Sequence, residues 1–241
     1  MDRALYTAMT GAKSTLGQQA AVAHNLANAD STGFRTEMHK MRAVEVQTTA
    51  WHTRAFVVDA SVATDFTPGA LKYSGSPYDV AVKGKGWLAV QTASGEAYTR
   101  DGALTVSENG ILQTQAGLPV LSDGGPITMP PDSEIVIGLD GTISAIQDGI
   151  TNEVARLKLV DPPENELVRG DDGFFRLESG LPAPMDEAVK VAGGYLETSN
   201  VNVAEQMVTM ISLARQFEMQ MRVITSAQEN DRAATQVIAP R

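Results

Sequence analysis

The chain has 241 residues, no cysteine and a formal net charge of −10 at pH 7. The absence of cysteine excludes disulfide bonds and thiolate metal sites, and the acidic charge argues against nucleic acid as a partner. No apolar run approaches the roughly 20 residues of a membrane span, and the N-terminus lacks the apolar core of a signal peptide. With 43% hydrophobic and 20% charged residues, the composition is that of a globular protein.

The acidic charge is concentrated in the middle of the chain. Residues 61–200 contain 9 basic and 20 acidic residues, whereas the two ends together sum to about zero. Glycine and proline follow the same division, since 18 of 21 Gly and 10 of 11 Pro lie between residues 68 and 194. Because these residues break helices and form turns, we expect helical ends on either side of a non-helical, solvated middle.

The N-terminal end predicts a helix from about Asp2 to Asn28. Apolar residues recur there in alternating steps of four and three, as in a coiled-coil seam. Full charges are carried by just three of the first 28 residues, so we expect this helix to be buried on more than one side. The predicted seam consists of Leu5, Met9, Ala12, Leu16, Gln19, Ala23 and Leu26.

The C-terminal end predicts a longer helix, from about Val203 to Val237. Asn202 and Glu205 have the types and spacing of an N-cap and its third helical residue. Methionine is frequent in the seam, which suits ordinary core filling and an adaptable interface equally well. The predicted seam consists of Val203, Met207, Met210, Ala214, Phe217, Met221 and Ile224.

Between the helices we predict short antiparallel strands that form a sandwich or small barrel. Alternating apolar residues occur at 79–83, 104–107, 135–139 and 157–159, and Asn109-Gly110 and Asp140-Gly141 have the composition of tight turns. The fold class is therefore mainly β with terminal α-helices, an antiparallel β domain inserted between coiled-coil-like helices. The expected parts are the N-terminal helical part at 1–35, an extended connection at 36–78, the β domain at 79–192 and the C-terminal helical part at 193–241.

Residue types that carry catalysis or bind metals form no convincing pattern. The spacings between His24, His39 and His52 match no common zinc motif. Residues 84–86, Gly-Lys-Gly, lack the rest of a phosphate loop and predict a bulge or turn. Residues 171–173, Asp-Asp-Gly, lack the spaced ligands of a calcium loop and predict a turn. We therefore expect no enzyme activity, cofactor or metal. A close carboxylate pair in the acidic middle, as in a periplasmic enzyme acting on glycan, stays open as an alternative.

Three stretches resemble one family, the flagellar rod, hook and hook-associated proteins. The first is HNLANADSTGFR at 24–35. The second comprises the β segments DVAV at 79–82, GWLAV at 86–90 and YTRDG at 98–102. The third is GYLETSNVNV at 194–203 followed by RQFE at 215–218. The resemblance spans essentially the whole chain, although His24 stands where the wider family often has Asn. MDRALY at 1–6, TPG at 67–69 and RGDDG at 169–173 look most like the proximal-rod members.

This resemblance implies a structural subunit of the proximal rod, with a distal-rod or hook subunit as the alternative. Such proteins leave the cell through the flagellar export apparatus without a cleaved signal and assemble in the periplasm with copies of themselves and other rod proteins. Their terminal helices form a torque-transmitting shaft around the export channel, without membrane insertion. The expected interface residues are Leu5, Met9, Leu16, Leu26, Asn28, Phe34, Met207, Met210, Phe217, Met221 and Ile224.

Overall fold

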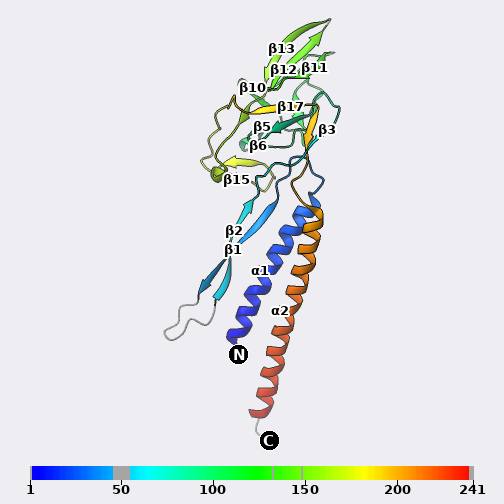
Figure 1. The fold of residues 1–241 in the computed structure, drawn as a ribbon. Coiled ribbons are helices and arrows are strands. Elements are labelled where there is room, and N and C mark those ends of the chain that lie inside the picture. Colours follow the sequence, from blue (N-terminus) through cyan, green and yellow to red (C-terminus); the bar gives the residue numbers. More distant parts are fainter. Residues whose placement is uncertain (1, 46–54, 132, 148, 239–241) are drawn as a thin grey trace. The chain divides into compact units, whose positions relative to one another are not determined.

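In a computed structural model the chain divides into two units (Figure 1). The structure describes residues 2–45, 55–131, 133–147 and 149–238. Unit 1 combines residues 1–29, 35–65 and 201–241, and unit 2 combines residues 30–34 and 66–200. Segments far apart in the sequence therefore belong to the same unit.

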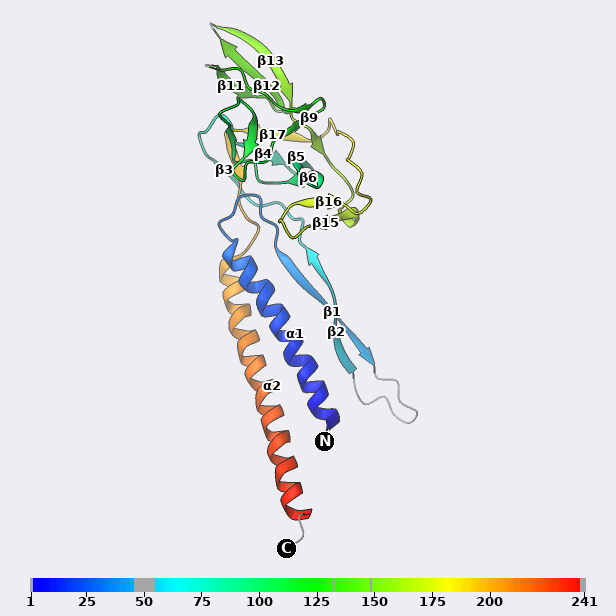
Figure 2. The same ribbon diagram turned by 180° about the vertical axis from the view of Figure 1, so that it is seen from behind.

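Unit 1 contains the two predicted helices, α1 (Asp2–Ala27) and α2 (Val203–Ile238). They lie side by side and run in opposite directions, as Figures 1 and 2 show from opposite sides. The predicted N-cap of α2 is confirmed, because the backbone N–H of Glu205 donates to Asn202 Oδ1 at 3.3 Å. Both helices end within one residue of the predicted positions.

A β-hairpin completes unit 1. Strand β1 (Glu37–Glu45) pairs antiparallel with β2 (Ala55–Thr64), with a register shift between Lys40 and Met41, and both strands contact α1. The hairpin occupies much of the region that was expected to be an extended connection. His52 lies outside the described residues.

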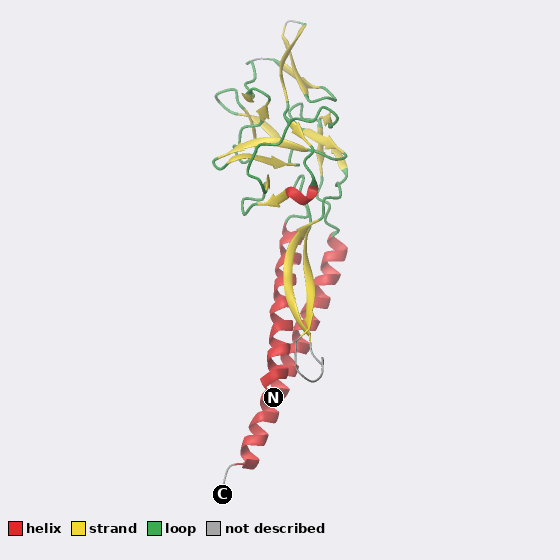
Figure 3. Ribbon diagram, turned by 90° about the vertical axis from the view of Figure 1, so that its left-hand side faces the viewer, coloured by secondary structure: helices red, strands yellow, loops and turns green. Residues whose placement is uncertain are grey.

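Unit 2 is built of short strands, which Figure 3 shows in yellow. Its described strand pairs are antiparallel, as predicted, and form one five-stranded sheet in the order β14-β5-β6-β16-β15, the three-stranded sheet β11-β12-β13 and several two-stranded sheets. The strands are β3 (Leu71–Tyr73), β4 (Val80–Lys83), β5 (Trp87–Thr92), β6 (Gly95–Thr99), β7 (Leu104–Val106), β8 (Leu112–Thr114), β9 (Leu121–Ser122), β10 (Gly125–Pro126), β11 (Glu134–Ile137), β12 (Thr142–Gln147), β13 (Ile150–Arg156), β14 (Leu159–Val160), β15 (Leu167–Arg169), β16 (Phe175–Leu177), β17 (Lys190–Gly193) and β18 (Tyr195–Glu197), with a 3-10 turn η1 (Glu164–Glu166) before β15.

The predicted turns of unit 2 are confirmed, and one predicted strand is wrong in detail. Turns occur at Asn109-Gly110 and Asp140-Gly141, and the chain bends at residues 84–86. The strand expected across residues 157–159 is instead divided. Leu157 forms an isolated bridge with Ser122, and β14 starts at Leu159. The alternating apolar pattern identified two buried side chains there without showing that they pair with different strands.

Unit 2 has a closely packed apolar interior. Its larger cluster includes Val90, Val120, Ile143 and Leu157, none of which exposes any measurable surface. A second cluster is aromatic, with the rings of Trp87 and Phe175 4.7 Å apart. Among the described residues, no helix combines the length and the hydropathy that a membrane span needs.

Candidate assembly surface

The side of α1 that faces α2 is made of small and polar residues. Thr15 Oγ1 lies 3.3 Å from Gln220 Oε1 of α2, within hydrogen-bond distance. Gly11 faces the same glutamine, since a Cβ at this position would lie 2.9 Å from Gln220 Nε2. Ala12 and Val22 are buried on the same stripe of α1. On the side of α1, the contact therefore uses little of the bulky apolar surface of that helix.

The contact side of α2 has the regular spacing of a helix seam. Six of its less exposed residues recur in steps of four and three, and Leu213 is the most buried of them. Two of the six are glutamines, so this side is also partly polar. The residues are Gln206, Met210, Leu213, Phe217, Gln220 and Ile224.

A neighbouring stripe on α1 is apolar and exposed to solvent. Met9 and Leu16, seven residues apart, expose 50% and 49% of their surface. Ala20 and Ala23 extend this stripe toward the end of the helix, and both are exposed. We call these four residues the outward stripe of α1.

α2 has a matching exposed stripe. Met207 and Met221 expose 50% and 42% of their surface, and Val203 exposes 39%. Ala214, midway between the two methionines, is also exposed. These four residues form the outward stripe of α2.

The two outward stripes lie on the same side of the helix pair. Each residue of an α-helix is rotated by about 100° about the helix axis from the residue before it. Leu16 comes directly after the buried Thr15, and Ala214 comes directly after the buried Leu213, so both are rotated by the same angle from the helix contact. In two antiparallel helices that face each other, equal rotations of the same sense lead to the same side of the pair. The β1–β2 hairpin does not cover that side, because Asn25, which bonds to β1, lies on the opposite flank of α1.

The structure separates the predicted interface residues into two groups. Those on the outward stripes are exposed, and those nearer the helix contact are half-buried. Exposed are Met9, Leu16, Met207 and Met221, and half-buried are Leu5, Leu26, Met210, Phe217 and Ile224. Each predicted seam therefore combines positions that face the partner helix with positions that face outward.

Asn28 and Phe34 lie beyond the end of α1 and already have contacts within the chain. Asn28 Nδ2 donates to the His24 carbonyl oxygen at 2.9 Å, and the same oxygen accepts the Asn28 backbone N–H at 3.2 Å, at the end of the helix. Phe34 is buried, and the guanidinium of Arg169 lies 4.7 Å from the centre of its ring. These contacts explain both residue types without a neighbouring subunit.

Asn25 has a structural role that the sequence reasoning missed. Its buried side chain donates through Nδ2 to the Glu37 carbonyl oxygen at 2.8 Å and accepts the Glu37 backbone N–H at Oδ1 at 2.9 Å. The amide thus pairs with Glu37 as a neighbouring strand would, and His24 Nδ1 lies 3.1 Å from the Glu37 carboxylate. An Asn near the end of a helix, shortly before an extended segment, was the available signal.

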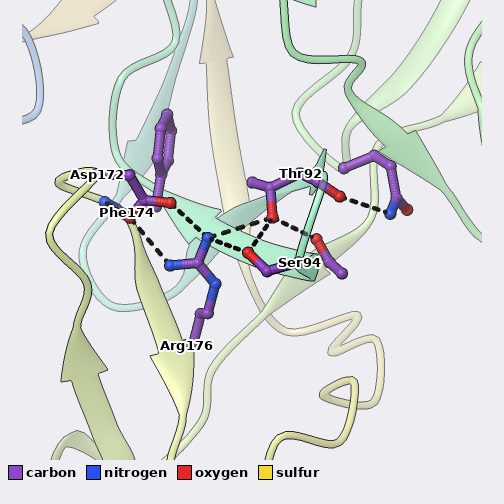
Figure 4. A network of polar contacts seen from close by, with 7 residues as sticks. Thr92, Ser94, Asp172, Phe174 and Arg176 are labelled. Carbon is purple, nitrogen blue, oxygen red and sulfur yellow. Dashed lines mark hydrogen bonds and ion pairs between the residues drawn. The ribbon is translucent and has the colours of Figure 1, made fainter.

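The predicted turn at residues 171–173 is confirmed and is part of a structural network (Figure 4). Asp172 binds the guanidinium of Arg176 through both carboxylate oxygens, and this pairing lowers the pKa of Asp172. Arg176 Nη2 also lies 3.2 Å from both Thr92 Oγ1 and Ser94 Oγ, at the turn between β5 and β6. The network joins two β-turns, and its aspartate is held ionised by the arginine.

The other acidic and histidine residues do not assemble into a metal site in the described part of the chain. No group of three or more His, Asp or Glu side chains there has the spacing to hold a metal ion. The outward stripes present exposed apolar side chains on one side of the helix pair, and α2 also exposes Val208, Ile211, Met219 and Val223 elsewhere on its surface. An apolar surface of this kind binds other apolar surfaces.

Models of known protein families match three parts of the chain. Residues 5–35 match the family described as flagella basal body rod protein, and residues 81–145 match the flagellar hook protein FlgE/F/G D1 domain. Residues 192–237 match the C-terminal region of the flagellar basal body rod FlgEFG proteins. The first and last of these matches contain most of α1 and α2 with their outward stripes.

Curated proteins are similar over nearly the whole length. The flagellar basal-body rod protein FlgF of Salmonella typhimurium is 47% identical over 99% of both chains. The proteins of the same name from Escherichia coli and Caulobacter vibrioides are 46% and 34% identical, over 99% and 98% of both chains. The relatives are structural proteins, which confirms the expectation of a structural role and leaves the glycan-acting enzyme without support.

Proposed function

The chain belongs to the FlgF family of flagellar basal-body rod proteins and is a structural subunit of the rod, and we propose that it assembles there through the outward stripes of α1 and α2. A subunit of the rod associates with other rod proteins. The observation that carries the proposal is the arrangement of apolar residues in unit 1. Met9, Leu16, Met207 and Met221 lie on the outward stripes and are about half exposed, whereas the side of α1 that faces α2 is made mainly of small and polar residues.

Burial of the outward stripes against neighbouring subunits supplies a driving force for assembly. Full burial of a Leu or Met side chain contributes roughly 1.5–3 kcal/mol. Met9, Leu16, Met207 and Met221 are about half exposed, so each has on the order of 1 kcal/mol left to gain. A polymer repeats this gain at every subunit, and the sum must exceed the cost of association.

The steps of four and three on each helix suit coiled-coil-like packing with more than one neighbour. One seam position contacts the partner helix of the same chain, and the other is available to a helix of an adjacent subunit. The half-buried residues Leu5, Leu26, Met210, Phe217 and Ile224 lie along the margin between these two contacts. In this arrangement Asn28 and Phe34 support the end of α1 from within the chain.

The proposal extends to how the rod works. Bundled terminal helices form a stiff shaft that transmits torque and encloses the channel through which later subunits are exported. The chain itself passes through the flagellar export apparatus without a cleaved signal and joins the proximal rod in the periplasm. Just three of the first 28 residues carry a full charge, which supports burial of α1 in the assembly, because charged side chains are expensive to bury.

A single substitution tests the proposed interface. Leu16→Asp places a charge in the middle of the outward stripe of α1, where burial in an assembly would leave it unpaired. We expect the variant to be produced at the normal level and to form no rods, as seen by electron microscopy of basal bodies and by loss of swimming.

The matched control is Leu181→Asp, which makes the same chemical change at an exposed leucine of unit 2. This variant should assemble normally. Rods of normal number in the Leu16→Asp strain would show that the outward stripe of α1 is not an interface.

A further inference from the structure

The chain passes between its two units several times, and each passage is short. It enters unit 2 at residue 30, leaves after residue 34, returns at residue 66 and leaves again after residue 200. Any force that reaches unit 2 from the helices through the covalent chain must act on residues 30–34, 66–70 or 197–200. The contacts of these three segments inside unit 2 therefore decide how such a force is shared.

Glu197 lies in the 197–200 segment and connects it to the other two segments. Its backbone carbonyl oxygen accepts the N–H of Gly33 at 2.8 Å, and its carboxylate Oε1 accepts the N–H of Gly69 at 2.8 Å. The side chain is completely buried. One residue thus holds the 30–34 segment with its backbone and the 66–70 segment with its side chain.

The second carboxylate oxygen of Glu197 binds a buried arginine. Arg100 Nη1 lies 3.0 Å from Oε2, and 4% of the Arg100 side chain is exposed. Arg100 also donates to the carbonyl oxygens of Val82 and Gly84, at the end of β4. Buried ion pairs cost much desolvation energy and often add little net stability, so their usual value lies in fixing one arrangement.

Asn200 provides a second connection between the same segments. Its backbone N–H donates to the Phe34 carbonyl oxygen at 3.4 Å, and its side-chain Nδ2 donates to the Thr67 carbonyl oxygen at 3.0 Å. Nδ2 also lies 3.3 Å from Thr67 Oγ1. Asn200 is the last residue before the chain leaves unit 2 for α2.

Two glycines allow these segments to lie close together. A Cβ on Gly69 would lie 1.9 Å from the Thr198 carbonyl oxygen. A Cβ on Gly33, which has a φ of 65°, would lie 2.2 Å from the carbonyl carbon of Arg100. No larger residue fits at either position without moving the backbone.

We propose that Glu197 and Asn200 are positioning residues that fasten all three segments into one cluster, so that torque carried by the terminal helices loads unit 2 through every passage at once. We call this set, consisting of Gly33, Phe34, Thr67, Gly69, Arg100, Glu197 and Asn200, the passage cluster. The role rests on the proposed function, since it matters only in a rod that transmits torque. Without the cluster, each passage would yield separately under load.

The test removes one connection and changes the load. Asn200→Ala deletes the side-chain bonds to Thr67 and keeps the backbone bond to Phe34, so unit 2 should still fold and rods should still assemble. We expect cells with this variant to carry the normal number of flagella and to swim at near-normal speed in plain medium. In medium thickened with a polymer, their speed should fall at least twofold below that of the parent strain.

A covalent replacement separates fastening from other roles of Asn200. The chain contains no cysteine, so any disulfide that forms within one chain of the double variant Thr67→Cys with Asn200→Cys must join these two positions. Under oxidising conditions this variant should swim like the parent strain in thick medium, and a membrane-permeant reductant should return it to the behaviour of Asn200→Ala. The parent strain treated with the same reductant is the control.

Three outcomes would overturn the inference. In the first, Asn200→Ala swims at the speed of the parent strain at every viscosity. In the second, its swimming speed falls by the same factor at every viscosity, which indicates a plain folding defect. In the third, the disulfide forms and swimming speed is not restored. None of these outcomes bears on the outward stripes, because flagellar number reports assembly independently. Conversely, if rods form in the Leu16→Asp strain, the proposed interface is wrong. The dependence of Asn200→Ala swimming speed on viscosity would then still be a separate result.

Discussion

The two units of this chain use their apolar residues in opposite ways. In unit 2 the large apolar side chains are inside, and Val90, Ile143 and Leu157 have no contact with solvent. In unit 1 the helix contact combines Leu213 of α2 with small and polar residues such as Thr15 of α1, while Leu16 and three methionines on the outward stripes remain about half exposed. A unit whose apolar surface is buried is complete by itself, whereas a unit that exposes such a surface is completed by a partner.

The polar residues show the same difference. Unit 2 pairs several of its buried polar groups internally, as in the Arg100–Glu197 pair and in the hydrogen bond that Ala183 N–H donates to Tyr98 Oη at 2.6 Å. The outward stripes of α1 and α2 contain no charged residue that would keep them separate from other helices. Three measurements can test this contrast, in order of decreasing expected effect.

Leu157→Ala should produce the largest loss of stability. Leu157 is fully buried in the larger apolar cluster of unit 2, and truncation of such a leucine costs about 2–5 kcal/mol because it leaves a cavity. Thermal unfolding of the purified chain, followed by near-ultraviolet circular dichroism, would measure the loss. An unchanged midpoint would mean that unit 2 is not the self-contained core that its burial indicates.

Raising the pH should weaken unit 2 by a smaller amount. Burial raises the pKa of Tyr98 to about 12 from an ordinary value of 10.0. Between these values the unfolded chain releases the phenolic proton and the folded chain retains it, so stability is full below pH 10 and falls as the pH rises toward 12. A shift of about two units corresponds to a loss of about 3 kcal/mol above pH 12.

Denaturant titrations at pH 9 to 12 would measure this decline, with Tyr98→Phe as the control. The control loses the hydrogen bond from Ala183 and starts from lower stability, but its stability should decline less over the same pH range. Equal slopes for the two proteins would show that the Tyr98 proton does not contribute.

Met221→Ser should have the smallest effect on the isolated chain. Met221 lies on the outward stripe of α2, and surface substitutions usually change stability by less than about 0.5 kcal/mol. Its effect should appear in assembly, as fewer rods per cell in electron micrographs. A marked loss of monomer stability with normal rod number would place Met221 in a contact within the chain and contradict the contrast between the units.

Much of this architecture could be predicted from local sequence. The Asn202 cap, the turns at Asn109-Gly110 and Asp140-Gly141 and the bounds of both helices depend on neighbouring residues, and the structure confirms them. Strand pairing was less predictable, because Leu157 and Leu159 follow one alternating pattern and yet pair with different strands. The alternation records burial and does not record the identity of the neighbour.

The sequence by itself determined that both ends of this chain are helices with apolar stripes, because helix period, caps and the exclusion of Gly and Pro are local properties. Only the tertiary structure decided which half of each stripe faces the other helix. At that contact the helices approach through Gly11 and Thr15, and the bulkier Leu16 and Met9 turn outward. Nor could any local pattern show that residues 33, 69, 100 and 197 meet, since their hydrogen bonds join segments that are up to 164 residues apart. The physical reason is the same in both cases, because backbone preference is set by adjacent residues and contact partners are set by how the whole chain packs.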